Sequence, residues 1–162
     1  MEDQQWSELL GQSDYLAEDG EYAFKALGSA DEKKKAILEI LKSLSVRMAT
    51  VPFEGGNDEG WILPVELELE SGDKREVKVV YKPWNFALRR SEWPDGEEPI
   101  ELAQRESGLA ELLGYPIDVC YGAFAGDFSV HGDFIWNVET GHTGFQQHIS
   151  SYQYNEEEWG DE

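Results

Sequence analysis

Two runs of alternating residues between positions 62 and 82 constrain the fold more than any other part of the sequence. In each run, apolar residues alternate with charged ones, which is the two-residue period of a half-buried strand. Ser71-Gly72-Asp73 lies between the runs and is typical of a tight turn. Pairing across this turn sets Leu67 opposite Val77 on the apolar face and glutamates opposite lysines on the other. We therefore predict a β-hairpin at about 62–82.

Helical signals dominate the N-terminal part of the chain. A short helix through Trp6–Leu10 and a second helical stretch near Ala17–Leu27 are expected from their apolar spacing. Ser29 followed by Glu32 fits a capping box and opens a helix over about 30–48. A further helix is predicted at about 100–113.

Between these elements, residues 51–60 are predicted to be a loop because they combine a proline with several glycines. Residues 84–96 form a connector that is rich in aromatic residues and arginine. After the helix at 100–113 the chain turns to β character. The strands that we expect there are 117–124, 128–131, 134–139 and 145–154.

Helices, then a hairpin, a helix and several antiparallel strands are the order of an α+β fold. A chain of 162 residues with 40% hydrophobic residues can bury a substantial core. We predict a single α+β domain over residues 1–154, followed by an acidic C-terminal tail at 155–162.

The distribution of charge is strongly asymmetric. The chain carries 34 acidic and 13 basic side chains, for a formal net charge of -21. The 57 residues from Glu106 onward contain eleven carboxylates and no lysine or arginine. Such a one-signed field repels nucleic acid and anionic membranes, and it attracts basic partners. We expect neither nucleic acid nor membrane as a partner.

Cysteine and histidine give little sign of catalytic or metal chemistry. Cys120 is the single cysteine, so no internal disulfide can form, and the predicted strand around it makes it an inert core thiol. His131, His142 and His148 lack the spacing of a metal-binding motif. We expect no metal, no cofactor, no catalytic residue and a cytoplasmic location.

These features predict an acidic, non-enzymatic binding protein. We expect an inhibitor of the immunity or antitoxin type, which neutralises a basic protein partner such as a toxin. Carboxylates would steer the encounter, and aromatic residues beside them would anchor the contact. The candidate partner-binding residues are Asp127, Asp133, Glu139, Tyr152, Tyr154, Glu156, Glu157, Glu158 and Trp159.

Residues 77–115 contain Tyr81-Lys82-Pro83 at a strand end, then Pro94-Asp95-Gly96 as a turn, then Arg105-Glu106 on a helix. This order resembles the small lobe of bacterial phosphatidylinositol-kinase-like proteins. The resemblance implies that Lys82 contacts ATP phosphates and pairs with Glu106. The alternative hypothesis is therefore a degenerate, kinase-like nucleotide-binding lobe. A third is a structural or accessory subunit whose charge is solubilising.

Overall fold

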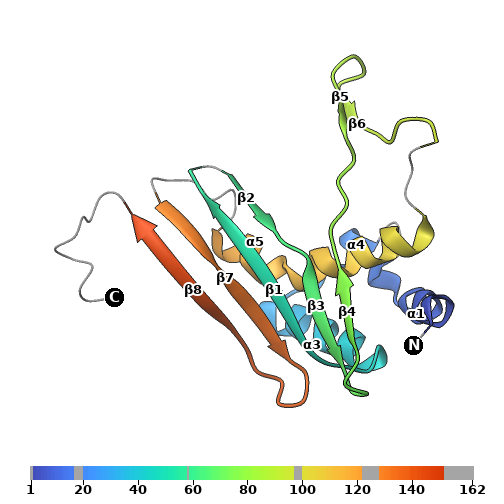
Figure 1. The fold of residues 1–162 in the computed structure, drawn as a ribbon, viewed down its shortest axis with the longest axis vertical. Coiled ribbons are helices and arrows are strands. Elements are labelled where there is room, and N and C mark those ends of the chain that lie inside the picture. Colours follow the sequence, from blue (N-terminus) through green and yellow to red (C-terminus); the bar gives the residue numbers. More distant parts are fainter. Residues whose placement is uncertain (1, 17–19, 58, 97–99, 122–127, 152–162) are drawn as a thin grey trace.

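The computed structural model describes residues 2–16, 20–57, 59–96, 100–121 and 128–151 of the chain (Figure 1). The helices are α1 (Asp3–Leu10), the 3-10 turn η1 (Asp14–Leu16), α2 (Gly20–Lys25), α3 (Ala30–Ser43), α4 (Glu101–Leu113) and α5 (Tyr115–Tyr121). The strands are β1 (Val46–Gly56), β2 (Glu59–Ile62), β3 (Val65–Leu69), β4 (Lys74–Val77), β5 (Trp84–Asn85), β6 (Arg90–Ser91), β7 (Phe128–Asn137) and β8 (Thr143–Ser151). The predicted α+β class is confirmed.

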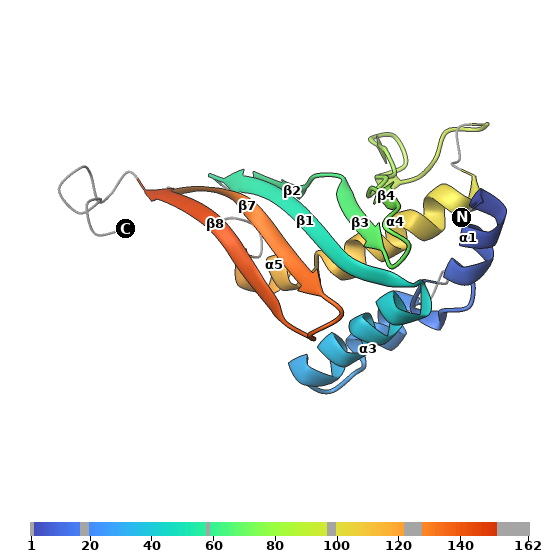
Figure 2. The ribbon, with the colours of Figure 1, turned by 60° about the horizontal axis from the view of Figure 1, so that its bottom comes forward.

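Strand β1 is the centre of the main sheet. The strand order is β4-β3-β1-β7-β8, and β2 pairs with the second half of β1 on the edge that β3 occupies in the first half. All of these pairs are antiparallel. Figure 2 shows α3, α4 and α5 together on one side of the sheet. No described helix covers the other side, which we call the open face.

The hydrophobic core lies between the sheet and the helices. The largest fully buried side chains are Trp6 of α1 and Trp136 of β7. Each indole N–H donates a hydrogen bond, from Trp6 to Glu106 Oε2 at 3.0 Å and from Trp136 to the Leu113 carbonyl at 2.9 Å. Both bonds satisfy the polar atom that a buried tryptophan brings into a core. Other fully buried residues are Ile37, Leu41, Ala49, Val51, Phe53, Leu67, Leu109 and Ile117.

Helix α3 begins as predicted. The Ser29 hydroxyl accepts a hydrogen bond from the Glu32 backbone N–H at 3.1 Å, which caps the helix. The predicted end of the helix near residue 48 is wrong. The helix stops at Ser43, and Ser45 takes a left-handed conformation with φ of 58°. The β1 strand then starts at Val46, and from Met48 to Phe53 its residues alternate between the two sides of the sheet.

The predicted loop at 51–60 is wrong as well, since β1 continues to Gly56 and β2 returns from Glu59. Pro52 misled the prediction, because proline is rarely tolerated inside a sheet. Its carbonyl accepts from the Leu63 N–H at 2.9 Å, at the break between β2 and β3. The N–H and C=O of a strand residue point to the same edge, so the N–H that Pro52 lacks falls at this break.

The predicted hairpin is present as β3 and β4, but its register differs by two residues. Val65, and not Leu67, lies opposite Val77. The loop consists of Glu70-Ser71-Gly72, in which Gly72 has φ of 92°. The last residue of a three-residue hairpin loop takes a left-handed conformation, and glycine adopts it most readily. A shift of two residues leaves each side chain on its predicted face.

The predicted helix at 100–113 is confirmed as α4, but the predicted strand at 117–124 is wrong. Residues 115–121 form helix α5, with Pro116 in the first turn, where proline is tolerated. Residues 122–124 lie outside the described residues. Ile117 is the buried residue of this helix, and Cys120 is exposed. The prediction of an inert core thiol is therefore wrong, because a helix turns Cys120 away from the core.

The final hairpin is longer and more regular than predicted. The strands expected at 128–131 and 134–139 are one strand, β7, and the strand expected from Phe145 begins at Thr143. The predicted turn at Glu139-Thr140-Gly141 is confirmed. Gly141 has φ of 76°, and its N–H donates to the Asn137 carbonyl at 2.8 Å. Residues 152–154 lie outside the described part.

Trp136→Phe tests the core directly. The change takes the donor away from the Leu113 carbonyl and leaves unfilled volume beneath β7. We expect the free energy of unfolding to fall by about 2–4 kcal/mol, measured by urea denaturation and circular dichroism. The control is Trp84→Phe at an exposed site, which should change it by less than about 0.5 kcal/mol. Equal losses in the two variants would contradict this account of the core.

Candidate interaction surface

The open face carries a row of apolar side chains, which we call the apolar strip. It consists of Met48 and Pro52 from β1, Ile135 from β7 and Trp61 from β2. Strand side chains alternate between the two faces, and the intervening residues are buried beneath the sheet, namely Ala49, Val51 and Phe53 on β1 and Phe134 and Trp136 on β7. Trp61 is 45% exposed, and the other three are half-buried. The strip therefore presents apolar area that the described helices do not cover.

Carboxylates surround the apolar strip. We call this set the acidic rim, and it consists of Glu54, Glu59, Glu66, Glu76 and Asp133. Asp133 lies opposite Pro52 across the β1–β7 pair, and Glu54 lies opposite Trp61. Among the described residues, Glu66 alone of the five forms an ion pair, with Lys74 at 3.2 Å. The other four carboxylates reach solvent, and none of them forms an ion pair with a cation in the described part of the chain.

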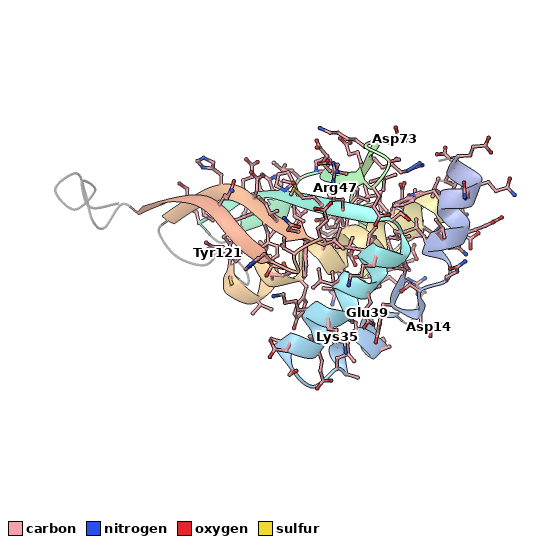
Figure 3. All side chains as sticks on the ribbon, turned by 90° about the horizontal axis from the view of Figure 1, so that it is seen from below. Asp14, Lys35, Glu39, Arg47, Asp73 and Tyr121 are labelled. Atoms are coloured by element: carbon pink, nitrogen blue, oxygen red, sulfur yellow. The ribbon has the colours of Figure 1, made fainter. Side chains whose placement is uncertain are left out.

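Besides Lys74, the cation Arg47 lies on this acidic side of the molecule. The β1 register shifts between Val46 and Met48, which makes Arg47 the extra residue of an irregularity in the strand. Its guanidinium pairs with Glu68 of β3, and its Nε lies 3.7 Å from Glu139 Oε1 in the turn after β7. Figure 3 shows Arg47 on the opposite side of the sheet from helix α3. A positive charge on β1 thus lies close to Glu139, in the last third of the chain, which has no lysine or arginine after Arg105.

The structure describes two of the residues that were predicted to bind a partner. Asp133 belongs to the acidic rim, and Glu139 is exposed in the β7–β8 turn beside Arg47. The remaining predicted residues lie outside the described residues; they are Asp127, Tyr152, Tyr154, Glu156, Glu157, Glu158 and Trp159. Sequence reasoning missed Glu54, Glu76 and Trp61, which β1, β2 and β4 bring to the same face.

Lys82 and Glu106, the two residues singled out by the kinase-lobe resemblance, do not form an ion pair. Lys82 is exposed, and Glu106 of α4 accepts the hydrogen bond from Trp6. A shallow hollow of about 110 Å³ beside Glu106 is lined by Lys78 rather than Lys82. Its other lining residues are Glu76, Val80 and Ala103.

The environment of Glu106 favours its neutral form. Burial raises the pKa of Glu106, and the nearby Asp3 acts in the same direction. The hydrogen bond from Trp6 and the charge of Arg75 lower the pKa, but they offset the burial only in part. Arg75 also stacks over the Trp6 ring at 4.9 Å and pairs with Asp3 at 2.6 Å. Glu106 therefore belongs to a network that ties α1, β4 and α4 together.

The connector after β4 forms a projecting arm, which we define as residues 81–93. Strands β5 and β6 pair with each other in a separate two-stranded sheet, and Figure 1 shows them extending away from the main sheet. The arm exposes Tyr81, Trp84, Phe86 and Leu88, with Phe86 reaching 85% exposure. Its charged residues are Lys82, Arg89, Arg90 and Glu92. The arm is thus basic and apolar in an acidic chain.

Over the described residues, no three histidine, cysteine, aspartate or glutamate side chains gather into a group that could hold a metal ion. In the same part of the chain, no helix is both long and apolar enough to cross a bilayer.

Comparison of the chain with protein-family models, with curated proteins and with solved structures gives no match.

Glu106→Gln tests the network around Trp6 by its pH dependence. Burial raises the pKa of Glu106 in the folded state, so the folded protein takes up this proton at a higher pH than the unfolded chain. Wild-type stability from this group is therefore greatest at low pH and is lost as the pH rises through the folded pKa. The glutamine keeps an oxygen for the Trp6 N–H but does not titrate.

We expect the variant to gain stability relative to the wild type as the pH rises from about 4 to about 7. Urea unfolding of both proteins at a series of pH values measures the difference. A stability difference between variant and wild type that stays constant over this range, or that shrinks, would show that burial does not raise the pKa of Glu106.

Proposed function

We propose that this protein is a non-enzymatic acidic binding protein that neutralises a basic protein partner, as an inhibitor of the immunity or antitoxin type does. The observation that carries the proposal is the open face, where the apolar strip is bordered by the acidic rim. The whole chain has a formal net charge of -21.

The two parts of this face supply different components of a binding free energy. Apolar area removed from water contributes roughly 25 cal/mol per Å², so burial of Trp61 and its neighbours supplies affinity. The carboxylates around the strip supply long-range attraction and fix the orientation of a cationic partner. An anchor of large apolar residues inside a polar rim is the usual anatomy of a protein interface.

The pairing of Glu66 with Glu76 supports a role for the rim beyond fold stability. These two glutamates lie directly opposite each other on β3 and β4. Like charges in this position destabilise a sheet, and Lys74 compensates only from the neighbouring position. A cationic side chain from a partner would relieve this repulsion, which makes the pair more favourable in a complex than in the free protein.

The kinase-lobe hypothesis stays a prediction. The hollow beside Glu106 is about 110 Å³, whereas pockets for small ligands typically measure roughly 300–1,000 Å³. A thermal shift with magnesium and ATP that is lost in Lys82→Ala would favour it. The accessory-subunit hypothesis differs from our proposal, because it expects function to be the same wherever the charges lie on the surface.

Two variants with the same net charge separate position from total charge. The face variant is Glu54→Gln/Glu76→Gln/Asp133→Asn, and the control variant is Glu2→Gln/Glu8→Gln/Glu39→Gln at exposed helical or N-terminal sites. We expect wild type and control variant, immobilised in lysate of the source cell at low salt, to retain the same basic protein. The face variant should retain at least tenfold less of it, measured by quantitative mass spectrometry.

Retention of the same proteins by the face variant and the control variant would contradict a specific acidic surface. It would favour the view that the charge is solubilising.

The association rate with the captured partner should fall steeply with salt. Raising the salt concentration shortens the Debye length from about 10 Å at 0.1 M toward about 3 Å at 1 M and screens the steering field. We expect at least a tenfold slower association at 0.5 M than at 0.05 M, measured by stopped-flow fluorescence. The face variant should show a smaller salt dependence than the wild type, because it has lost three steering charges. An association rate that is unchanged by salt would show that the carboxylates do not steer.

A further inference from the structure

Four of the large apolar side chains that the described residues expose lie in the arm. Tyr81, Trp84, Phe86 and Leu88 are between 52% and 85% exposed, although apolar residues of this size are more often packed against neighbours. An exposed cluster of such residues on a soluble domain marks an interaction site. The arm therefore has the composition of an interface rather than of a surface loop.

The internal contacts of the arm are few. The Glu92 N–H donates to the Pro83 carbonyl at 3.0 Å, and the Asn85 side chain bonds both Glu92 and the Leu88 N–H at 3.0 Å. Strands of two residues each make up the ladder. An isolated two-stranded hairpin is marginally stable at best in water, so packing against another surface would stabilise the arm.

The charge of the arm is opposite to that of the rest of the molecule. Lys82, Arg89 and Arg90 face a single carboxylate, Glu92, which pairs with Arg90 at 2.9 Å. Lys82 and Arg89 are exposed and form no ion pair with another described residue. The surface that fits this arm is therefore acidic and has apolar area at its centre.

We propose that the open face of a second copy of this chain is that surface, so that two copies exchange arms across a twofold axis. The apolar residues of each arm pack on the apolar strip of the other copy, and Lys82 and Arg89 meet its acidic rim. This dimer uses the face to which the proposed function assigns a basic partner, and the two therefore compete for it.

The area involved suits a stable dimer. Burial of the four large side chains of each arm at roughly 100 Å² apiece, with an equal area of the faces that they meet, gives about 1,600 Å² in total. This is the size of a standard protein interface. Two copies of charge -21 repel each other at a distance, but at 0.15 M salt this repulsion is screened beyond about 8 Å. Contacts between arm and face act within that range.

Sedimentation velocity and light scattering of the purified wild-type chain at about 0.15 M salt measure the association, with no other protein present. We expect a reversible dimer with twice the chain mass of 18.4 kDa at micromolar concentrations. A specific interface of this size is expected to associate at concentrations below roughly 100 μM. A wild type that remains a monomer at about 100 μM would therefore overturn the proposal. That result would leave the binding of a basic partner to be judged by its own experiment.

The arm variant Trp84→Ser/Phe86→Ser/Leu88→Ser should raise the dimer dissociation constant at least tenfold. The face variant should do the same, whereas the control variant, with the same net charge as the face variant, should dimerise like the wild type. Circular dichroism and urea unfolding check that the arm variant keeps the fold, because the arm lies outside the core. An arm variant that is folded and still dimerises like the wild type would overturn the proposal.

A mixture of the arm variant and the face variant gives the sharpest test. The arm variant keeps an intact face, and the face variant keeps an intact arm, so a mixed dimer contains one complete contact. We expect the mixed pair to associate more tightly than either variant alone and more weakly than the wild type. A mixture that associates no more tightly than the separate variants would overturn arm exchange, because contacts between two arms or between two faces predict that result.

Discussion

The pairing of β1 with β7 is the interaction on which the rest of the fold depends. It joins residues 48–56 to residues 129–137 in an unbroken antiparallel ladder, across about 80 residues of intervening chain. The inward side chains of the two strands, among them Val51 and Trp136, are fully buried against the helices. The same ladder puts Pro52 beside Asp133 and brings Arg47 within reach of Glu139. The composition of the open face is therefore a consequence of one long-range contact.

Local signals in the sequence predicted the elements that local physics determines. The Ser29 cap, the helix at 100–113, the hairpin around Gly72 and the turn at Gly141 each rest on residues within a few positions of each other. The failures at Pro52 and at residues 115–121 have different causes. Pro52 fits a central strand only because β2 and β3 part beside it, and residues 115–121 are too short a run for periodicity to separate helix from strand.

The sign of the candidate surface was predictable, but its composition was not. An excess of carboxylates in the last third led us to predict an acidic partner-binding region there, and of its residues Asp133 lies on the open face. The rest of the rim comes from β1, β2, β3 and β4, which the sequence places far from β7. Counting charges along the chain also overlooked the contact of Arg47 with Glu139, because compensation between charges is set by distance in space.

Strand β4 determines how this sheet can meet other proteins. It forms one edge of the main sheet, where unpaired N–H and C=O groups could template another strand. The strand is only four residues long, and Lys74, Arg75 and Glu76 make up three of them. A short and densely charged edge resists the addition of a foreign strand. At this edge the sheet is protected against growth into an extended β-assembly, even though the chain exposes enough apolar area elsewhere to associate.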